Sequence, residues 1–331
     1  MDSDVVFQST QQTTIDARST LHVNGAASYL GGTFTGPGTL QHNGTALLSS
    51  SNPLSATRFL QNGLLTAINP ANTATIDSAV IDFLPGSVTR LFTNLHLQGR
   101  AIIRPDATFE GNGTLVIDLT ASLTAGGILG VDLENQGTVR PGYSPGVLSV
   151  AGDYLQGPSA ALQIELAGTN RGDWDQLSAS GSVSLDGTLN VFLFGGFTPL
   201  LGDSFTIVSA SGGLSGKFGN LALPALPVGQ FWSIDYSRTA VVLSTTNGLL
   251  GDTNGDQKVD IQDLNNVRNN FGGTGLGDTD DNGTVDISDL NNVRNNFGIG
   301  NANPVPEPNT YALATIGLIG LAGVIWQRKR R

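Results

Sequence analysis

The chain has 331 residues, with 44 glycines, 39% hydrophobic and only 13% charged residues, and a formal net charge of −11. This length allows about two domains, and so much glycine with so little charge favours short strands and turns over long surface helices. The acidic balance argues against a nucleic-acid partner, and the lack of Cys excludes disulfides, thiolate metal sites and cysteine nucleophiles.

Residues 1–248 show short apolar alternations and no helical period, which predicts a mainly β domain. A turn-plus-strand phrase recurs in it at irregular spacing. Glycine permits the positive φ of a tight corner, and the following Thr and Leu or Val start a strand with one side chain out and one in. Stacked corners of this kind predict a β-solenoid. The phrase occurs at Gly36–Leu40, Gly111–Leu115, Gln136–Val139 and Asp186–Leu189. We expect Phe231 to Ser244 to form the final strands that close the domain.

Residues 105–220 resemble bacterial autotransporter-type passenger repeats. The resemblance rests on Pro141–Leu148, Gly152–Tyr154, Gly172–Leu177 and Gly202–Phe205. It implies a right-handed β-helix displayed outside the cell, with no single activity attached to it.

Residues 249–300 contain a repeat with a period of 26 residues, in which Gly251 to Gly272 recurs as Gly277 to Gly298 with only the loop interiors differing. Each copy opens with a loop that offers oxygen atoms at positions 1, 3, 5, 7, 9 and 12, the pattern of an EF-hand calcium loop. We therefore predict two Ca²⁺ ions. The first would be bound by Asp252, Asn254, Asp256, Asp260, Asp263 and the carbonyl of Lys258, and the second by Asp278, Asp280, Asn282, Asp286, Asp289 and the carbonyl of Thr284.

Each loop is followed by an amphipathic stretch and preceded by no helix-forming segment, so we expect loop-then-helix units rather than full EF-hands. The apolar residues recur at i, i+3 and i+7, which predicts one apolar stripe per helix and packing of the two stripes against each other. The stripes are Leu264, Val267 and Phe271 in the first copy and Leu290, Val293 and Phe297 in the second.

This arrangement resembles a type I dockerin over the whole of Gly251–Gly298. The resemblance implies docking onto a cohesin-like protein, with positions 10 and 11 of each loop choosing the partner. Those positions hold Ile261 and Gln262, and Ile287 and Ser288, in place of the Ser-Thr pair common in cellulosomal dockerins.

The two loops differ at position 6, where a sharp turn needs a left-handed backbone. Gly283 provides it in the second loop, whereas the first loop has Gln257. A non-glycine residue there costs about 1–2 kcal/mol, or roughly tenfold in affinity. We therefore predict that the first site is the weaker one.

The C-terminal part combines a polar linker over residues 301–310, an uncharged run from Tyr311 to Trp326 and a basic tail from Arg328 to Arg331. The run would span roughly 24 Å as a helix, slightly less than a hydrocarbon core of about 30 Å. We predict a single transmembrane helix within residues 311–331, with its basic end in the cytoplasm. A buried core helix is the less favoured alternative.

The order Pro306, Glu307, Pro308, apolar run, basic tail resembles a PEP-CTERM sorting signal. The resemblance implies that an exosortase recognises the Pro-Glu-Pro element, cleaves the chain and releases it from an inner-membrane intermediate to the cell envelope, surface or exopolymer matrix. Met1 to Val6 show no secretory signal. We therefore expect an internal start or a fragment rather than a cytoplasmic protein.

No catalytic motif stands out. We expect His22, His42 and His96 at solvent-facing strand positions, and Asp173 and Asp175 as a turn carboxylate pair rather than a glycosidase acid and base.

Two functions remain open. The first is a non-catalytic, calcium-binding surface or matrix protein that mediates adhesion or docking, with a matrix polysaccharide as one possible partner. The second is a polysaccharide-degrading enzyme, a glycoside hydrolase or lyase on a β-helix. The low aromatic content of 7% and the dispersed acids of residues 1–248 favour the first.

Overall fold

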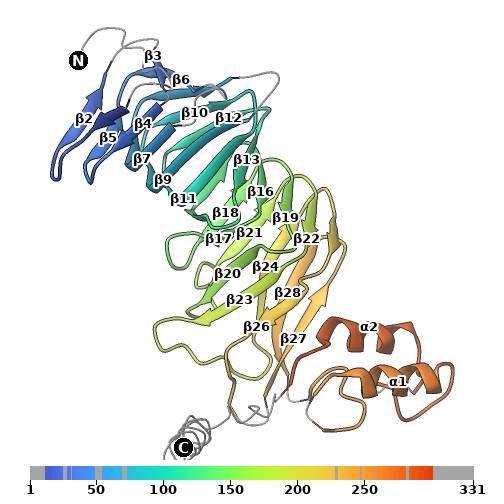
Figure 1. Ribbon diagram of the computed structural model, residues 1–331. Coiled ribbons are helices and arrows are strands. Elements are labelled where there is room, and N and C mark those ends of the chain that lie inside the picture. The colour runs from blue at the N-terminus through green and yellow to red at the C-terminus, as the bar shows by residue number, and fades with distance from the viewer. Residues whose placement is uncertain are drawn as a thin grey trace, which may run out of the picture. The chain divides into compact units, whose positions relative to one another are not determined.

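The computed structural model describes residues 12–24, 28–30, 32–48, 54–68, 73–227, 230–246, 248–256, 258–280 and 283–300 (Figure 1). The chain divides into two compact units, Met1–Gly248 and Leu249–Arg331. Within the first unit, successive coils of chain stack strand on strand in parallel, which confirms the predicted β-solenoid.

The strands of the first unit form three ladders that run along the solenoid. The first ladder contains β1 (Gln12–Thr14), β4 (Gly32–Thr35), β7 (Leu54–Gln61), β9 (Ala74–Phe83), β11 (Leu95–Ile103), β13 (Thr114–Ile117), β16 (Asp132–Asn135), β19 (Tyr154–Gln156), β22 (Val183–Leu185) and β25 (Leu214–Gly216). The second contains β2 (Thr20–Val23), β5 (Thr39–His42), the second halves of β7, β9 and β11, then β14 (Ser122–Ala125), β17 (Thr138–Pro141), β20 (Ala161–Leu166), β23 (Thr188–Leu193) and β26 (Asn220–Ala222).

The third side is made by two shorter sheets. One contains β3 (Ser28–Leu30), β6 (Thr45–Leu48), β8 (Leu64–Ala67), β10 (Val88–Leu91) and β12 (Thr108–Gly111). The other contains β15 (Gly127–Leu129), β18 (Val147–Val150), β21 (Gln176–Ala179), β24 (Ser204–Ala210), β28 (Ala240–Thr246) and β27 (Phe231–Tyr236).

The core is a set of apolar columns produced by the register of the ladders. Side chains alternate in and out along each strand, and parallel pairing places each inward residue on the inward residue of the next coil. One column in the second ladder is buried throughout. It consists of Leu40, Phe59, Ile81, Ala101, Leu123, Val139, Leu162 and Leu189.

The recurring turn phrase starts strands as predicted. Thr39, Thr114, Thr138 and Thr188 are the first residues of β5, β13, β17 and β23, and the residue after each is buried. The glycine before each Thr is also required by close packing against the preceding coil, which the sequence did not reveal. A Cβ on Gly137 would lie 2.3 Å from the carbonyl oxygen of Ala121, so the preceding coil leaves no room for a side chain.

An antiparallel hairpin ends the parallel stack. β28 pairs antiparallel with β24 and with β27, which confirms the predicted closing strands. Phe205 and Trp232 are buried there with ring centroids 6.4 Å apart.

Polar side chains also form columns, both outside and inside the solenoid. On the outside, Asn62 donates to Asn43 at 3.0 Å and Asn43 donates to Asn24 at 2.8 Å. Inside, His42 is completely buried, with Nδ1 2.9 Å from Oε1 of Gln61. The expectation of a solvent-facing His42 was therefore wrong, because this residue occupies the inward position of β5.

The second unit contains helices α1 (Ile261–Asn270) and α2 (Ile287–Asn296), which contact each other (Figure 1). Across the described part of the chain, neither these helices nor any other is long and apolar enough to cross a membrane. The segment 311–331, where we predict a transmembrane helix, lies outside the described residues.

We expect Gly137→Ala to destabilise the solenoid, because the added Cβ meets a backbone carbonyl that cannot move without shifting a coil. Overpacking of this kind costs about 1–3 kcal/mol. Urea unfolding of the full chain measures it. Gly248→Ala is the matched control, since nothing lies within 4 Å of the added Cβ; equal stabilities of the two variants would contradict the explanation.

Candidate metal centre

The second loop brings three carboxylates together. The ligand oxygens of Asp278, Asp280 and Asp289 lie within 4.8 Å of one another, at loop positions 1, 3 and 12. Among the residues that the structure describes, this is the single cluster of three or more acidic or His side chains of that compactness. Its donors are all carboxylate oxygens, the ligand chemistry that Ca²⁺ requires.

Asp289 is the anchor of this loop. It is completely buried, and its Oδ1 accepts from the amide of Thr279 at 2.6 Å while its Oδ2 accepts from the amide of Asp286 at 2.7 Å. Burial raises the pKa of Asp289, but hydrogen bonds from Asp286, Thr279 and Asp280 together outweigh burial and lower it. The carboxylate is therefore held ionised and oriented towards the loop.

The same residues start the helices. Asp260 and Asp286 are the N-caps of α1 and α2, and each forms a capping box with the Asp three residues later. Position 12 of each loop thus performs two tasks: Asp263 and Asp289 fix the first turn of the helix and face the loop.

The carboxylates of the first loop accept hydrogen bonds from the loop backbone, as Asp278 of the second loop does from the amide of Gly283 at 2.8 Å. The Oδ1 of Asp252 accepts from the amide of Gly255 at 2.7 Å, and the Oδ1 of Asp256 accepts from the amide of Lys258 at 3.0 Å. Asp263 keeps the position of its counterpart, accepting from the amide of Thr253 at 2.8 Å. Three of its carboxylates are thus hydrogen-bonded to the loop's own backbone, and none of them belongs, within the described part of the chain, to a cluster like that of the second loop.

The two halves of the unit are built on each other. Val259 of the first loop pairs with the segment after α2, through bonds of 2.8 Å to Ile299 and Gly298. In return, Val285 of the second loop pairs with Gly272 and Gly273, after α1, at 2.8 and 2.9 Å. Each loop therefore depends on the end of the other half's helix for its backbone partners.

The glycine before each loop also packs against the other half of the unit. A Cβ on Gly251 would lie 2.9 Å from the Cα of Val293 on α2, and one on Gly277 would lie 3.1 Å from the Cα of Val267 on α1. Both glycines also have positive φ, of 99° and 110° respectively. The repeated glycines are therefore required by close packing as well as by backbone conformation.

The predicted apolar stripes need a correction. Val267 and Val293 are completely buried, but Phe271 and Phe297 are 55% and 47% exposed. Both Phe residues lie at the C-caps, one position beyond the helices, where the backbone leaves the helical conformation. Extending the helical period to i+7 therefore placed them on the wrong surface.

Several predicted residues cannot be located. The residues outside the described part of the chain are Gln257 and Asn282 of the two predicted calcium loops, and Pro306, Glu307 and Pro308 of the sorting element. The carbonyl-bearing residues at position 7 are described: Lys258 is half-buried and bridged to Gly300, and Thr284 is exposed.

Asp173 and Asp175 have separate structural roles. Asp173 accepts from the side chain of Asn170 at 2.9 Å within one turn. Asp175 is buried and joins two coils, accepting from the amides of Gly146 at 2.7 Å and Glu165 at 2.9 Å. Burial raises the pKa of Asp175 to about 7, and the nearby charge of Glu165 acts in the same direction.

A polar groove on the solenoid was missed by the sequence reasoning. It lies across successive coils and includes two acids that we had counted as dispersed, Asp77 and Asp118. A polar residue recurring once per coil is the signal that could have found it, but coil length varies too much for the register to be read from the sequence.

Comparison with known proteins identifies a motif in the C-terminal segment. Residues 304–331 match the PEP-CTERM protein-sorting motif. The PEP-CTERM motif implies an exported surface protein that is processed by an exosortase, as the Pro-Glu-Pro element predicted. No curated protein matches the chain.

We expect Asp175 to make the solenoid less stable as pH rises. Between about pH 4 and pH 7 the folded state holds the proton that an unfolded Asp, with a pKa of 3.8, has already lost, so unfolding becomes easier with increasing pH. Asp175→Asn should flatten this slope, whatever its effect on absolute stability. Urea midpoints at pH 5 and pH 8 measure the slope. Asp173→Asn is the control for loss of charge and should keep the wild-type slope; an unchanged slope in Asp175→Asn would refute the assignment.

Proposed function

We propose that this chain is an exported calcium-binding protein of the cell surface or exopolymer matrix, whose β-solenoid is a non-catalytic body and whose second unit docks a partner protein. The sorting motif supports the destination. The observation that carries calcium binding is the cluster of Asp278, Asp280 and Asp289.

Calcium would act on the loops by removing charge repulsion. The second loop gathers the carboxylates of Asp278, Asp280 and Asp289, and without a cation these repel one another. A bound divalent cation compensates for that repulsion and stabilises the capping boxes that start α1 and α2. An exported module meets millimolar calcium, so a Kd of about 10⁻⁴ to 10⁻³ M suffices.

The docking surface would lie at the helix starts. Ile261 and Ile287, at position 10 of the two loops, are each 56% exposed. The resemblance to dockerins assigns partner choice to these positions, and large apolar side chains favour an apolar partner surface. A cohesin-like protein is the partner of that class.

We expect calorimetric titration of the full chain with Ca²⁺ to show two sites, the one at the second loop being tighter. Asp278→Asn should weaken that site at least tenfold, about 1.4 kcal/mol, because it removes one ligand charge. Asp252→Asn should weaken mainly the other site. Asp235→Asn, which removes a carboxylate from the solenoid, should change neither. Binding of no calcium by the wild type would refute the proposal.

We expect Glu307→Ala to block processing, because it changes the centre of the Pro-Glu-Pro element. Mass spectrometry of cell fractions from the producing bacterium should then show a chain that retains residues 309–331 in the membrane fraction. Glu134→Ala, on β16 of the solenoid, is the control and should be processed normally. Release of Glu307→Ala at the wild-type level would contradict recognition through this element.

A further inference from the structure

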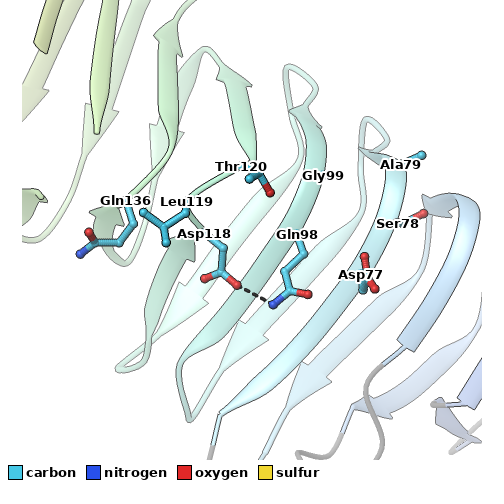
Figure 2. A pocket seen from close by; sticks show the side chains of 9 residues that line it. All are labelled: Asp77, Ser78, Ala79, Gln98, Gly99, Asp118, Leu119, Thr120 and Gln136. Atoms are coloured by element: carbon cyan, nitrogen blue, oxygen red, sulfur yellow. Dashed lines mark hydrogen bonds between the residues drawn. The ribbon is translucent and has the colours of Figure 1, made fainter. Parts of the chain in front are cut away.

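A groove of about 830 Å³ crosses the outer face of the solenoid between β9 and the turn after β16 (Figure 2). Its volume is within the range of about 300–1,000 Å³ typical of ligand sites. Polar side chains from four successive coils line it, with small apolar patches between them. The residues that matter for its chemistry are Asp77, Gln98, Asp118, Gln136, Ala79 and Leu119.

The polar side chains form a row because the coils are in register. Asp77 of β9 is paired with Gln98 of β11. Gln98 donates to the Oδ2 of Asp118 on the following coil at 2.7 Å, and Figure 2 shows the two side chains turned towards each other. Gln136 lies one coil further, where its backbone N–H donates to the backbone carbonyl of Ile117 at 2.8 Å.

Part of this row is fixed in orientation. Besides the bond from Gln98, Asp118 has its Oδ1 2.7 Å from Nδ1 of His96. Gly99 supports the groove floor with φ of 131°, and a Cβ there would lie 1.8 Å from the carbonyl oxygen of Ser78. A side chain at this position would displace the coil, so the groove is built on closely packed backbone. Preorganisation of this kind reduces the entropy cost of binding.

The groove chemistry excludes three classes of ligand. Among the described residues that line it, none is Lys or Arg, so anionic polymers have no counter-charge there. Asp77 and Asp118 lie two coils apart, or about 10 Å, too far to share one metal ion. A peptide strand would need a free sheet edge, whereas the strands beneath the groove are paired on both sides.

With these three classes excluded, a neutral polyhydroxylated chain is the ligand class that fits the groove. Carboxylates accept hydrogen bonds from vicinal hydroxyls, and side-chain amides both donate to them and accept from them. Leu119, 67% exposed, offers an apolar contact to the C–H face of a sugar ring. We propose that the groove binds a neutral polysaccharide laid across the coils. This site lies in the solenoid and does not depend on calcium in the second unit.

The test is calorimetric titration of the full chain with cellohexaose, mannohexaose and dextran, and with oligogalacturonate as the anionic comparison. At least one neutral probe should bind, and 0.5 M NaCl should leave its Kd unchanged because no ion pair is involved. Asp77→Ala and Gln98→Ala should each raise that Kd about fivefold, the loss of one or two hydrogen bonds. Both residues are exposed, so the core is untouched.

Asp235→Ala is the control with the same loss of charge, since Asp235 is exposed on β27 outside the groove. It should bind like the wild type. The proposal is overturned if no neutral probe binds, if only oligogalacturonate binds, or if both groove variants retain wild-type affinity. Titrations repeated with EDTA and with Asp278→Asn should give the same Kd, so a failure here is distinguishable from a failure of the calcium proposal.

Discussion

The in-register parallel stacking of coils is the constraint on which the solenoid depends. A coil is too thin to bury its own apolar residues, so each inward side chain is covered by its counterpart in the next coil, as Leu40 is covered by Phe59 and Phe59 by Ile81. A slip of one residue would turn this column outwards. Register therefore fixes the core and the outer face at the same time.

The outer face inherits its chemistry from that register. Asp77, Gln98 and Asp118 form a row because the coils that carry them are aligned, although about twenty residues of chain separate neighbours in the row, as in the Gln98–Asp118 bond. Asp175 shows the same dependence: it bridges Gly146, 29 residues away in the chain, only because two coils lie side by side. Long-range order along the stack is thus what turns scattered polar residues into sites.

Local periodicity explains how far the sequence could be read. The Gly-Thr-Leu phrase is a short-range signal, so the solenoid and the starts of β5, β13 and β23 were predictable, as was the loop-then-helix order of the second unit. The buried His42 and the exposed Phe271 were not. Alternation does not say which of its two faces is the inner one, and a helical period does not show where a helix ends. The groove was hidden for a third reason, because pairing between coils of unequal length cannot be inferred from one sequence.

The second unit has a small core, and its two halves stabilise each other through backbone pairing. Each half supplies one loop and one helix, and Val259 and Val285 pair with the segments that follow the opposite helix. Each loop is therefore held in part by backbone of the other half. An ion at Asp278, Asp280 and Asp289 would fix the start of α2, and Gly251, just before the first loop, packs against Val293 of the same helix. The two copies are identical in their second halves, Asp263–Gly272 and Asp289–Gly298, which carry most of each helix and the start of the segments that pair with the opposite loop.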